Sequence, residues 1–577
     1  MGLRTLSASL VFAALAAGQP SQPPLPKQER TRWFQDAKFG MFIHWGAYSV
    51  IGRHEWARHR FQIPQAAYDQ YARRFNPVNY DPNLWVDIAA NAGCKYMVIT
   101  SKHHDGFSIW RSRASDYDME TTAYPGDPLK MLAQACRNKN MRLGFYHSIM
   151  DWHHQDYLPK RAWETAEPKR GGDNNRYVDF MKAQLNELLT GFGDVSMLWF
   201  DGEWEHTLRD LKRDDEIYDF ILGLQPNCLI NDRLYERAPG NRADFGTPEQ
   251  HVPATGMKDP AGQPTLWESC VTINRDSWGY NKYETEFKTT RDLIRMLIEV
   301  VSKGGNLLLN VGPTPDGRIQ DEFVTRLNAM GQWMKANGEA IYGTTASPFA
   351  RLPFYGRATT KGSTLFLHVY EWPADGKLRV PGLKNLVHSA YLLADPRTKL
   401  ETRRDGDDIL VSTPAGGPDE TASVVVLRLD GAPVTVPYVI RPDRKGVLSL
   451  GAESCEIQTK FEQRAKLENA LGRVFLTNWS RPEDVPTWTF SAPKAGRYAV
   501  RVSYAAARGG RGTEFSVASG KAALAGKVQD TGGDWVFKSF PLGEIQLAAG
   551  EQTLEVKAKV QGSAAMTLEK VTLTPVE

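Results

Sequence analysis

The sequence has few cysteines and no long run of charge of one sign. Only five of its 577 residues are cysteine and no Cys-x-x-Cys pair occurs, which excludes a dense disulfide framework. The 70 basic and 67 acidic residues give a formal net charge of +3 and are interspersed. Binding driven by a nucleic-acid backbone needs a concentrated basic surface, so nucleic acid is excluded as a partner. We expect the cysteines to be small buried residues, with at most one disulfide.

Long hydrophobic segments are also absent, except near the N-terminus. An apolar run at residues 10–17 follows Arg4 and precedes small residues and Gln19-Pro20. It is too short to span a membrane and is typical of a secretory signal peptide, here residues 1–18, followed by a linker at 19–32. The sequence therefore predicts a secreted or periplasmic protein with no membrane partner.

The length of the chain and the change in its hydrophobic pattern indicate several domains, because a single domain rarely exceeds ~250–300 residues. Over residues 33–345, short apolar strands alternate with amphipathic helices, which predicts a parallel sheet with crossover helices. A (β/α)8-like barrel is the expected fold of this α/β region, and a doubly wound open sheet is the alternative. Short strands separated by Gly, Pro and Asp then predict two β-sandwich domains, at 346–442 and 443–577.

Polar residues follow the apolar strands of the predicted barrel, where the site of such a barrel forms. They are His44, His103-His104-Asp105, Tyr146-His147, Asp201-Gly202-Glu203, Asn231-Asp232-Arg233 and Glu268, the last after a strand at 265–267. Residues 30–345 also hold ten of the twelve histidines and twelve of the sixteen tryptophans. Pyranose rings pack on aromatic side chains while their hydroxyls need directional partners. The pattern therefore indicates a sugar or polyol site.

A metal site is the main alternative, given the number of histidines. The sequence contains no His-Glu-x-x-His and no His-x-His pair. His103 and His104 are adjacent, and in an extended chain their side chains point to opposite faces, so they would not easily share one ion. We predict no metal and no other cofactor, and keep metal-assisted hydrolysis as an alternative that loss of activity in chelator would support.

Six sequence blocks occur in the order found in one enzyme family. They lie at 33–46, 55–56, 102–107, 199–202, 267–270 with 277–280, and 305–310. In these blocks the chain resembles the retaining α-L-fucosidases of glycoside hydrolase family 29. The resemblance implies a barrel enzyme that releases terminal α-L-fucose from fucosylated glycans by double displacement, followed by the family's β-sandwich at 346–442.

The resemblance also implies residue roles. Asp201 matches the nucleophile, and Glu268 matches the general acid/base of the subfamily with broad aryl-fucoside activity. Glu249 is the main rival for the acid role, because Glu203 and Glu205 are so close to Asp201 in the chain that they would crowd the same face. The positions that match the fucose pocket are His44, Glu55, Trp56, His103, His104, Tyr146, Trp199 and Arg233.

Several questions stay open at this stage. His147 stands where many relatives have a second tyrosine, so its role is undecided. The last domain looks like a carbohydrate-binding jelly roll, but for Trp479, Trp488 and Trp535 core packing is favoured over ligand binding. A non-catalytic fucose- or glycan-binding protein on the same barrel is the alternative to an enzyme, and paired carboxylates disfavour it. The preferred linkage and the oligomeric state are not encoded in any recognisable pattern.

Overall fold

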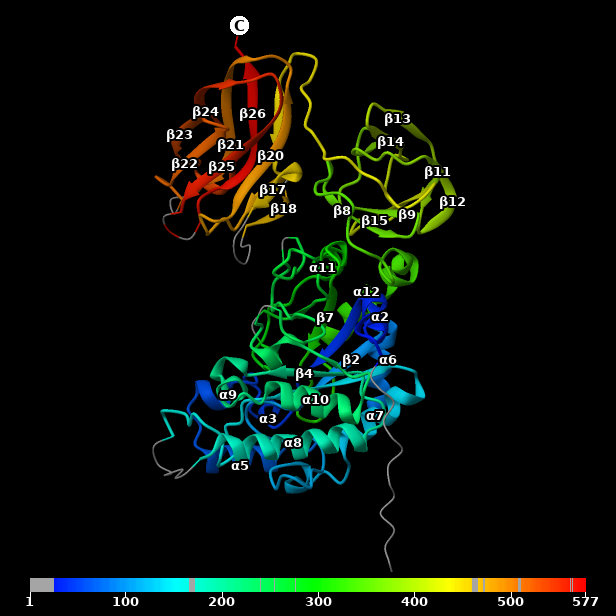
Figure 1. Ribbon diagram of the computed structural model, residues 1–577, viewed down its shortest axis with the longest axis vertical. Coiled ribbons are helices and arrows are strands. Elements are labelled where there is room, and N and C mark those ends of the chain that lie inside the picture. The colour runs from blue at the N-terminus through cyan, green and yellow to red at the C-terminus, as the bar shows by residue number, and fades with distance from the viewer. Residues whose placement is uncertain are drawn as a thin grey trace, which may run out of the picture.

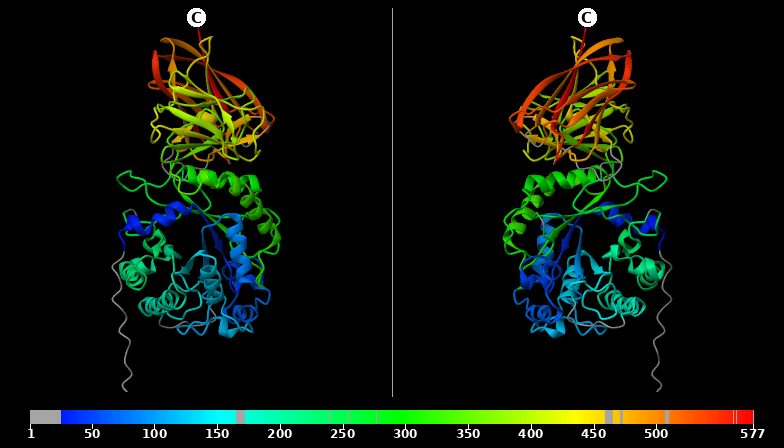
Figure 2. Two further views of the ribbon diagram at one scale, coloured as in Figure 1. Left: turned by 90° about the vertical axis from the view of Figure 1, so that its right-hand side faces the viewer. Right: turned by 90° about the vertical axis from the view of Figure 1, so that its left-hand side faces the viewer.

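The computed structural model describes residues 25–164, 172–238, 240–253, 255–275, 277–458, 465–470, 473–506, 510–560, 562 and 564–576. The predicted signal peptide at 1–18 lies outside these residues. The first region is one parallel sheet surrounded by helices (Figures 1 and 2). Its strands are β1 (Phe39–Ile43), β2 (Tyr96–Lys102), β3 (Arg142–Ser148), β4 (Met197–Asp201), β5 (Leu229–Ile230), β6 (Glu268–Thr272) and β7 (Asn306–Val311).

The sheet closes through a segment that forms no regular strand. Its strand order is β5-β4-β3-β2-β1-β7-β6, so β5 and β6 are the edges. Residues 244–250 run between them: the amide of Asp244 donates to the carbonyl of Ile230 at 2.8 Å, and the amide of Glu268 donates to the carbonyl of Gly246 at 2.9 Å. Isolated parallel bridges also join this closing segment to both edges. The predicted (β/α)8-like barrel is confirmed.

Helices precede, separate and follow the strands, and the longer ones cover the outside of the barrel (Figures 1 and 2). They are α1 (Lys27–Arg30), α2 (Arg32–Ala37), α3 (Tyr48–Ile51), α4 (Ala57–Arg60), α5 (Gln65–Arg73), α6 (Pro82–Ala92), α7 (Pro128–Asn138), α8 (Asn174–Gly191), α9 (Thr207–Leu211), α10 (Asp214–Leu224), α11 (Thr290–Ser302) and α12 (Asp321–Asn337). Local sequence sets some of these boundaries. Asp81 and Asp127 cap α6 and α7 by accepting backbone N–H bonds, and each precedes a proline at the first helical position.

β6 begins later than the sequence predicted. The expected strand at 265–267 was to end just before Glu268 and so place this carboxylate at the carboxyl end of the barrel strands. Instead Glu268 is the first residue of β6 and pairs with Asn306, the first residue of β7. Glu268 therefore lies at the amino-terminal end of the barrel. A buried polar residue inside a longer apolar run was mistaken for the end of that run.

Two antiparallel regions follow the barrel, each with two sheets around its own apolar core. The first contains β8 (Gly356–Lys361), β9 (Thr364–Val369), β10 (Lys377–Val380), β11 (Val387–Leu392), β12 (Asp395–Leu400), β13 (Thr402–Asp405), β14 (Asp408–Ser412) and β15 (Ser423–Leu429). The second contains β16 (Leu448–Gly451), β17 (Glu456–Gln458), β18 (Lys466–Ala470), β19 (Arg473–Thr477), β20 (Val485–Ala492), β21 (Gly496–Ala506), β22 (Glu514–Ser519), β23 (Ala522–Lys527), β24 (Gly533–Leu547), β25 (Gly550–Lys559) and β26 (Thr567–Pro575). A sandwich-like C-terminal part is confirmed, while the jelly-roll assignment stays a prediction.

The first antiparallel region packs on the barrel helices α11 and α12. Trp333 of α12 donates its indole N–H to the carbonyl of Ala422 at 3.0 Å, and Arg295 of α11 donates to the carbonyl of Thr421 at 2.9 Å. Phe366 belongs to the same apolar core as the barrel. Figure 1 shows both antiparallel regions on this side of the barrel.

Three observations bear on expectations about the cysteines, membrane spans and tryptophans. All five cysteines lie in the described part of the chain and are free thiols, so the disulfide allowed for is absent. Among the described residues, no helix is long and apolar enough to cross a membrane. Trp479 and Trp488 are fully buried, in agreement with core packing, whereas Trp535 is 49% exposed.

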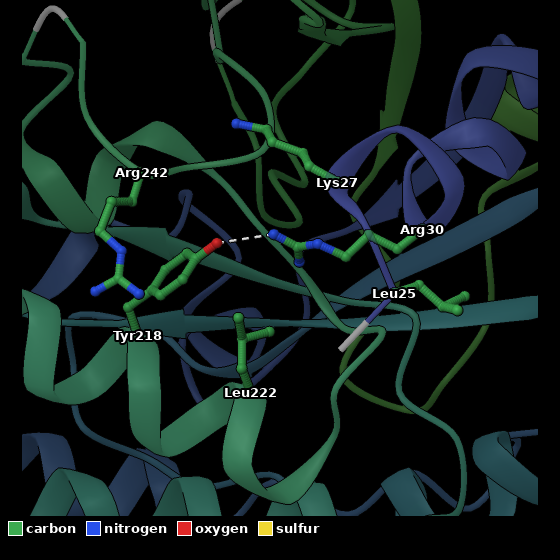
Figure 3. A pocket seen from close by; sticks show the side chains of 6 residues that line it. All are labelled: Leu25, Lys27, Arg30, Tyr218, Leu222 and Arg242. Atoms are coloured by element: carbon green, nitrogen blue, oxygen red, sulfur yellow. Dashed lines mark hydrogen bonds between the residues drawn. The ribbon is translucent and has the colours of Figure 1, made fainter. Parts of the chain in front are cut away.

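Arg30 fixes the closing segment from outside the barrel. Its guanidinium donates to both carboxylate oxygens of Asp244, at 2.5 and 2.9 Å, and both side chains are buried. The same guanidinium donates to Tyr218 Oη at 2.8 Å (Figure 3). Arg30 and Tyr218 also line a shallow pocket of about 370 Å³, together with Leu25, Lys27, Leu222 and Arg242. None of these six residues was predicted to act in catalysis.

We expect Arg30→Ala to lower the free energy of unfolding of the barrel by ~3–5 kcal/mol, because it leaves the Asp244 carboxylate buried and unpaired. Urea denaturation measures the loss. Arg242→Ala is the matched control, since Arg242 borders the same pocket but pairs with the exposed Asp215 and Asp219, and such pairs contribute ~0–1 kcal/mol. Equal losses in the two variants would contradict a special role for Arg30.

Candidate active site

The carboxyl ends of β1 to β4 bring most of the predicted site residues together. His44 directly follows β1, His103 and His104 follow β2, Tyr146 lies in β3, and Asp201 is the last residue of β4. All five are at most 8% exposed. The rings of His103 and Tyr146 are stacked with their centroids 5.4 Å apart. These strand ends therefore form one continuous buried polar surface.

Asp201 is the central charge of this surface. Tyr146 Oη donates to its Oδ2 at 2.8 Å, Arg233 Nη1 donates to its Oδ1, and His104 Nε2 lies 3.5 Å from Oδ2. Burial by itself would raise the pKa of the Asp201 carboxyl, but the Arg233 guanidinium and the Tyr146 hydroxyl outweigh burial and lower this pKa to about 2. Asp201 is therefore ionised at neutral pH.

Arg233 holds a second carboxylate beside Asp201. It follows β5 in the short helix η3 (Asp232–Tyr235), and its side chain is 2% exposed. Its Nη2 donates to Glu249 Oε2 at 2.8 Å and its Nε donates to Thr247 Oγ1 at 3.1 Å, so both contacts reach the closing segment. The Glu249 side chain is 37% exposed. One guanidinium thus joins a buried carboxylate to a solvent-accessible one.

Two buried histidines present hydrogen-bond acceptors to the site. Asn310 Nδ2 donates to the Trp278 carbonyl at 2.7 Å, so its Oδ1 accepts from His44 Nδ1 at 2.7 Å. The Ser148 hydroxyl donates to a backbone carbonyl at 2.6 Å and accepts from His104 Nδ1 at 2.6 Å. Burial lowers the pKa of both histidines to about 4, so they are neutral at pH 7. Each Nε2 can then accept a hydrogen bond from a hydroxyl group.

Glu55 joins two loops at the edge of the site. Its Oε2 accepts the backbone N–H groups of Trp278 at 3.0 Å and Gly279 at 2.8 Å. Burial by itself would raise the pKa of the Glu55 carboxyl, but the nearby His54 imidazole and the backbone N–H of Gly279 outweigh burial and lower this pKa. The neighbouring Trp56 ring lies edge-on, with its centroid 5.1 Å from that of His104. Both predicted residues therefore border the Asp201 surface.

An apolar wall faces the histidines, and sequence reasoning did not identify all of it. The Phe42 ring centroid lies 5.1 Å from that of Trp199 and 6.0 Å from that of Trp278. Trp199 was predicted, whereas Phe42, Trp278 and Asn310 were not. Each of the three lies within a sequence block that the chain shares with the family, so the resemblance could have identified them as site residues. Which of these side chains meet at the site depends on how the strands and loops are brought together in the closed barrel.

The structure does not bring Glu268 to Asp201. The Glu268 carboxyl is fully buried, accepts from Trp199 Nε1 at 3.1 Å and accepts from Tyr96 Oη. It lies level with Asn306, four residues before Asn310, which corresponds to roughly 13 Å along the strand at ~3.3 Å a residue. Burial raises the pKa of Glu268 to about 7, which suits an acid. Its position does not fit the acid/base role that the sequence predicted.

Three further ionisable residues considered from the sequence, His147, Glu203 and Glu205, have other partners or positions. His147 is fully buried, with Nδ1 3.2 Å from Ser101 Oγ, and follows Tyr146 on the opposite face of β3. Glu203 Oε1 accepts from Arg237 at 3.0 Å, and Glu205 pairs with Arg161. None of these groups is placed as a partner of Asp201.

His103, His104 and Asp201 could also contact one ion, since one ligand atom from each lies within 4.8 Å of the others. The expectation that the two histidines point apart is wrong. Their ring centroids are 4.2 Å apart, because β2 ends at Lys102 and the chain is no longer extended. The fit to a cation is nevertheless poor, since the Arg233 guanidinium already contacts the same carboxylate and would repel a second positive charge.

The neutral histidines predict a loss of stability in acid. Unfolded histidine has a pKa of ~6.5, whereas that of folded His104 is about 4. Between these values the unfolded chain binds more protons, so the free energy of unfolding falls as the pH is lowered. We expect His104→Gln to reduce this slope by up to ~1.4 kcal/mol per pH unit, measured by urea denaturation at pH 7.0, 5.5 and 4.5. An unchanged slope, or the same change with exposed His388→Gln, would contradict this account.

Comparison with known proteins agrees with the site. The family model described as alpha-L-fucosidase matches residues 10–339. Tissue alpha-L-fucosidase of Homo sapiens is 31% identical over 395 residues, which are 63% of this chain and 80% of the human protein.

Solved structures extend the likeness. Alpha-L-fucosidase isoenzyme 1 of Paenibacillus thiaminolyticus is 38% identical (TM-score 0.66, 70% of this chain, 99% of that chain), and the enzyme of Vibrio sp. strain EJY3 is 27% identical (TM-score 0.74, 96% and 98%). The GH29 enzyme of Bacteroides thetaiotaomicron, trapped as a covalent intermediate with a glutamate-to-glutamine mutant, is 27% identical (TM-score 0.63, 71% and 98%). The chain belongs to the α-L-fucosidase family of glycoside hydrolases.

Proposed function

We propose that this protein is a retaining, exo-acting α-L-fucosidase in which Asp201 is the nucleophile and Glu249, rather than Glu268, is the general acid/base. The observation that carries the proposal is the Arg233 guanidinium, which contacts both carboxylates at the mouth of the barrel. Retaining glycosidases use two carboxyl groups ~5–5.5 Å apart. Because Asp201 and Glu249 contact the same guanidinium, their carboxyl groups are held close together. Glu268 instead contacts the Trp199 indole N–H and, in the described part of the chain, forms no ion pair with Arg233.

The reaction takes place in two displacements. Ionised Asp201 attacks the anomeric carbon while protonated Glu249 transfers its proton to the departing glycosidic oxygen, which gives a covalent fucosyl-enzyme. Glu249, now a carboxylate, takes a proton from water as that water attacks the same carbon and releases Asp201. The exposures of the two side chains support these roles, because the acid/base must meet both leaving group and water, and Glu249 is the more open residue.

The surrounding residues favour fucose as the sugar. The unprotonated Nε2 atoms of His44 and His104 can accept hydrogen bonds from sugar hydroxyls. Phe42, Trp278 and Trp199 provide an apolar surface, and fucose is a 6-deoxy sugar that carries a methyl group where most hexoses carry a hydroxymethyl group. A site with acceptors on one side and an aromatic wall on the other therefore suits a terminal α-L-fucosyl residue.

Two alternative functions, a non-catalytic glycan-binding protein and a metal-assisted hydrolase, require different features of the site. A pure glycan-binding protein does not need an ionised buried carboxylate beside a second acidic group, which is what surrounds Arg233. A metal-assisted hydrolase would lose activity in EDTA, whereas the double displacement proposed here needs only the two carboxyl groups. The covalent intermediate trapped in the Bacteroides thetaiotaomicron relative supports the retaining mechanism.

Two further predictions from the sequence remain proposals. Export to the periplasm or medium is supported by the signal-peptide pattern at 1–18, and the N-terminal sequence of the mature protein tests it. Glycan binding by 443–577 now depends on Trp535, because Trp479 and Trp488 are buried. Affinity electrophoresis in fucosylated mucin, with Trp535→Ala as the comparison, tests this second proposal.

Hydrolysis of p-nitrophenyl α-L-fucoside tests the two carboxylates. We expect Asp201→Ala to lower kcat by several orders of magnitude, because no covalent intermediate can form. We expect Glu249→Gln to lower turnover of this substrate ~10²–10⁴-fold, because no base remains to take a proton from the water that hydrolyses the covalent intermediate; p-nitrophenolate itself departs without a proton. Azide restores both variants, and gives a β-fucosyl azide with Asp201→Ala and an α-fucosyl azide with Glu249→Gln. The anomer identifies the role.

Glu268→Gln is the control for this assignment. Its amide oxygen can still accept the Trp199 N–H, so we expect its kcat to stay within ~10-fold of that of the wild type, with no rescue by azide. Rescue of Glu268→Gln, together with an unaffected Glu249→Gln, would return the acid/base role to Glu268. An inactive wild type would overturn the fucosidase proposal itself.

A further inference from the structure

One buried carboxyl group is not used by the double displacement. Both oxygens of Glu268 are hydrogen-bonded, Oε1 to Trp199 Nε1 at 3.1 Å and Oε2 to Tyr96 Oη. The side chain is 0% exposed, and these two hydrogen bonds offset the cost of removing a carboxyl group from water. A carboxyl group provides two acceptor oxygens for two donors that converge from different strands.

Trp199 connects this carboxyl group to the site above it. The Arg233 guanidinium lies over the Trp199 ring, 4.4 Å from its centroid, and the Tyr146 ring is stacked on it at 5.7 Å with an interplanar angle of 20°. Arg233 and Tyr146 are the two residues whose hydrogen bonds hold Asp201. The Trp199 indole therefore packs against both residues that hydrogen-bond to Asp201, Arg233 and Tyr146.

We propose that Glu268 is a positioning residue: by accepting the indole N–H it fixes the Trp199 ring, and through Trp199 it sets the positions of Arg233 and Tyr146 around Asp201. This inference rests on the proposed function. A ring without that acceptor either leaves a buried N–H unpaired or rotates to find another partner. Rotation changes the surface under Arg233 and Tyr146, and small displacements of catalytic groups slow a reaction strongly.

The test is a double-mutant cycle on turnover of α-L-fucosyl fluoride, whose departing fluoride needs no general acid. Glu268→Leu removes the acceptor, Glu268→Gln keeps it, and Trp199→Phe removes the N–H. We expect Glu268→Leu to lower kcat by about 10–100-fold and Glu268→Gln to stay near the wild type. In the Trp199→Phe background, we expect Glu268→Leu to have little further effect on kcat, because no N–H remains to be held.

Glu187 offers a matched control. It accepts the indole N–H of Trp110 at 3.0 Å, so it makes the same type of pair outside the catalytic site. Glu187→Leu is expected to lower the melting temperature without changing the kcat of the folded enzyme. This comparison separates a loss of positioning from a general loss of packing, and melting curves of all the variants confirm that each one is folded at the assay temperature.

Three results would overturn the inference. Glu268→Leu could keep the wild-type kcat, its effect could add fully to that of Trp199→Phe, or azide could rescue it, which would make Glu268 a catalytic acid. If Glu268→Leu does not fold, a Glu268→Gln variant that loses as much kcat as Trp199→Phe also overturns it. Failure of the proposed function is a separate outcome, recognised by a wild type that turns over neither fucosyl fluoride nor the aryl fucoside.

Discussion

The buried guanidinium of Arg233 is the interaction on which the site depends. A buried positive charge is tolerated only with close counter-charges and satisfied hydrogen bonds. Asp201 at the end of β4 supplies the buried counter-charge, and Glu249 and Thr247 of the closing segment accept further hydrogen bonds from the same guanidinium. The same contacts lower the pKa of Asp201 and keep the second carboxylate at the mouth of the site. Electrostatic pairing thus both assembles and tunes the catalytic centre.

Closure of the barrel and formation of the site are coupled through one irregular segment. Residues 244–250 bridge the edge strands, and they also carry Thr247 and Glu249 to Arg233. Arg30 anchors the start of the segment from outside by its contacts with Asp244. Thr247 and Glu249 are two residues apart, the spacing at which an extended chain places both side chains on one face, here the face toward Arg233.

The interior of the barrel is arranged in levels along the strands. The catalytic charges and neutral histidines occupy the carboxyl ends, an aromatic layer that includes Trp199 and Tyr146 lies below them, and Glu268 lies below that layer. Burial keeps His44 and His104 uncharged, so Asp201 is balanced by Arg233 rather than by several competing cations. A carboxyl group with a raised pKa is therefore not by itself evidence for catalysis, because Glu268 has one and lies away from the reacting atoms.

The sequence by itself determined the barrel, the sandwich-like C-terminal part and most of the polar surface around Asp201. Apolar strands followed by His44, His103 and Asp201 indicate which end of the barrel carries the chemistry. The tertiary structure alone decided that Glu268 lies at the opposite end and that Glu249 lies beside Arg233. Alternation along a strand specifies which face a residue occupies, but its height in the barrel depends on pairing with neighbouring strands. The closing segment has no periodic pattern, so only the closed barrel places its residues.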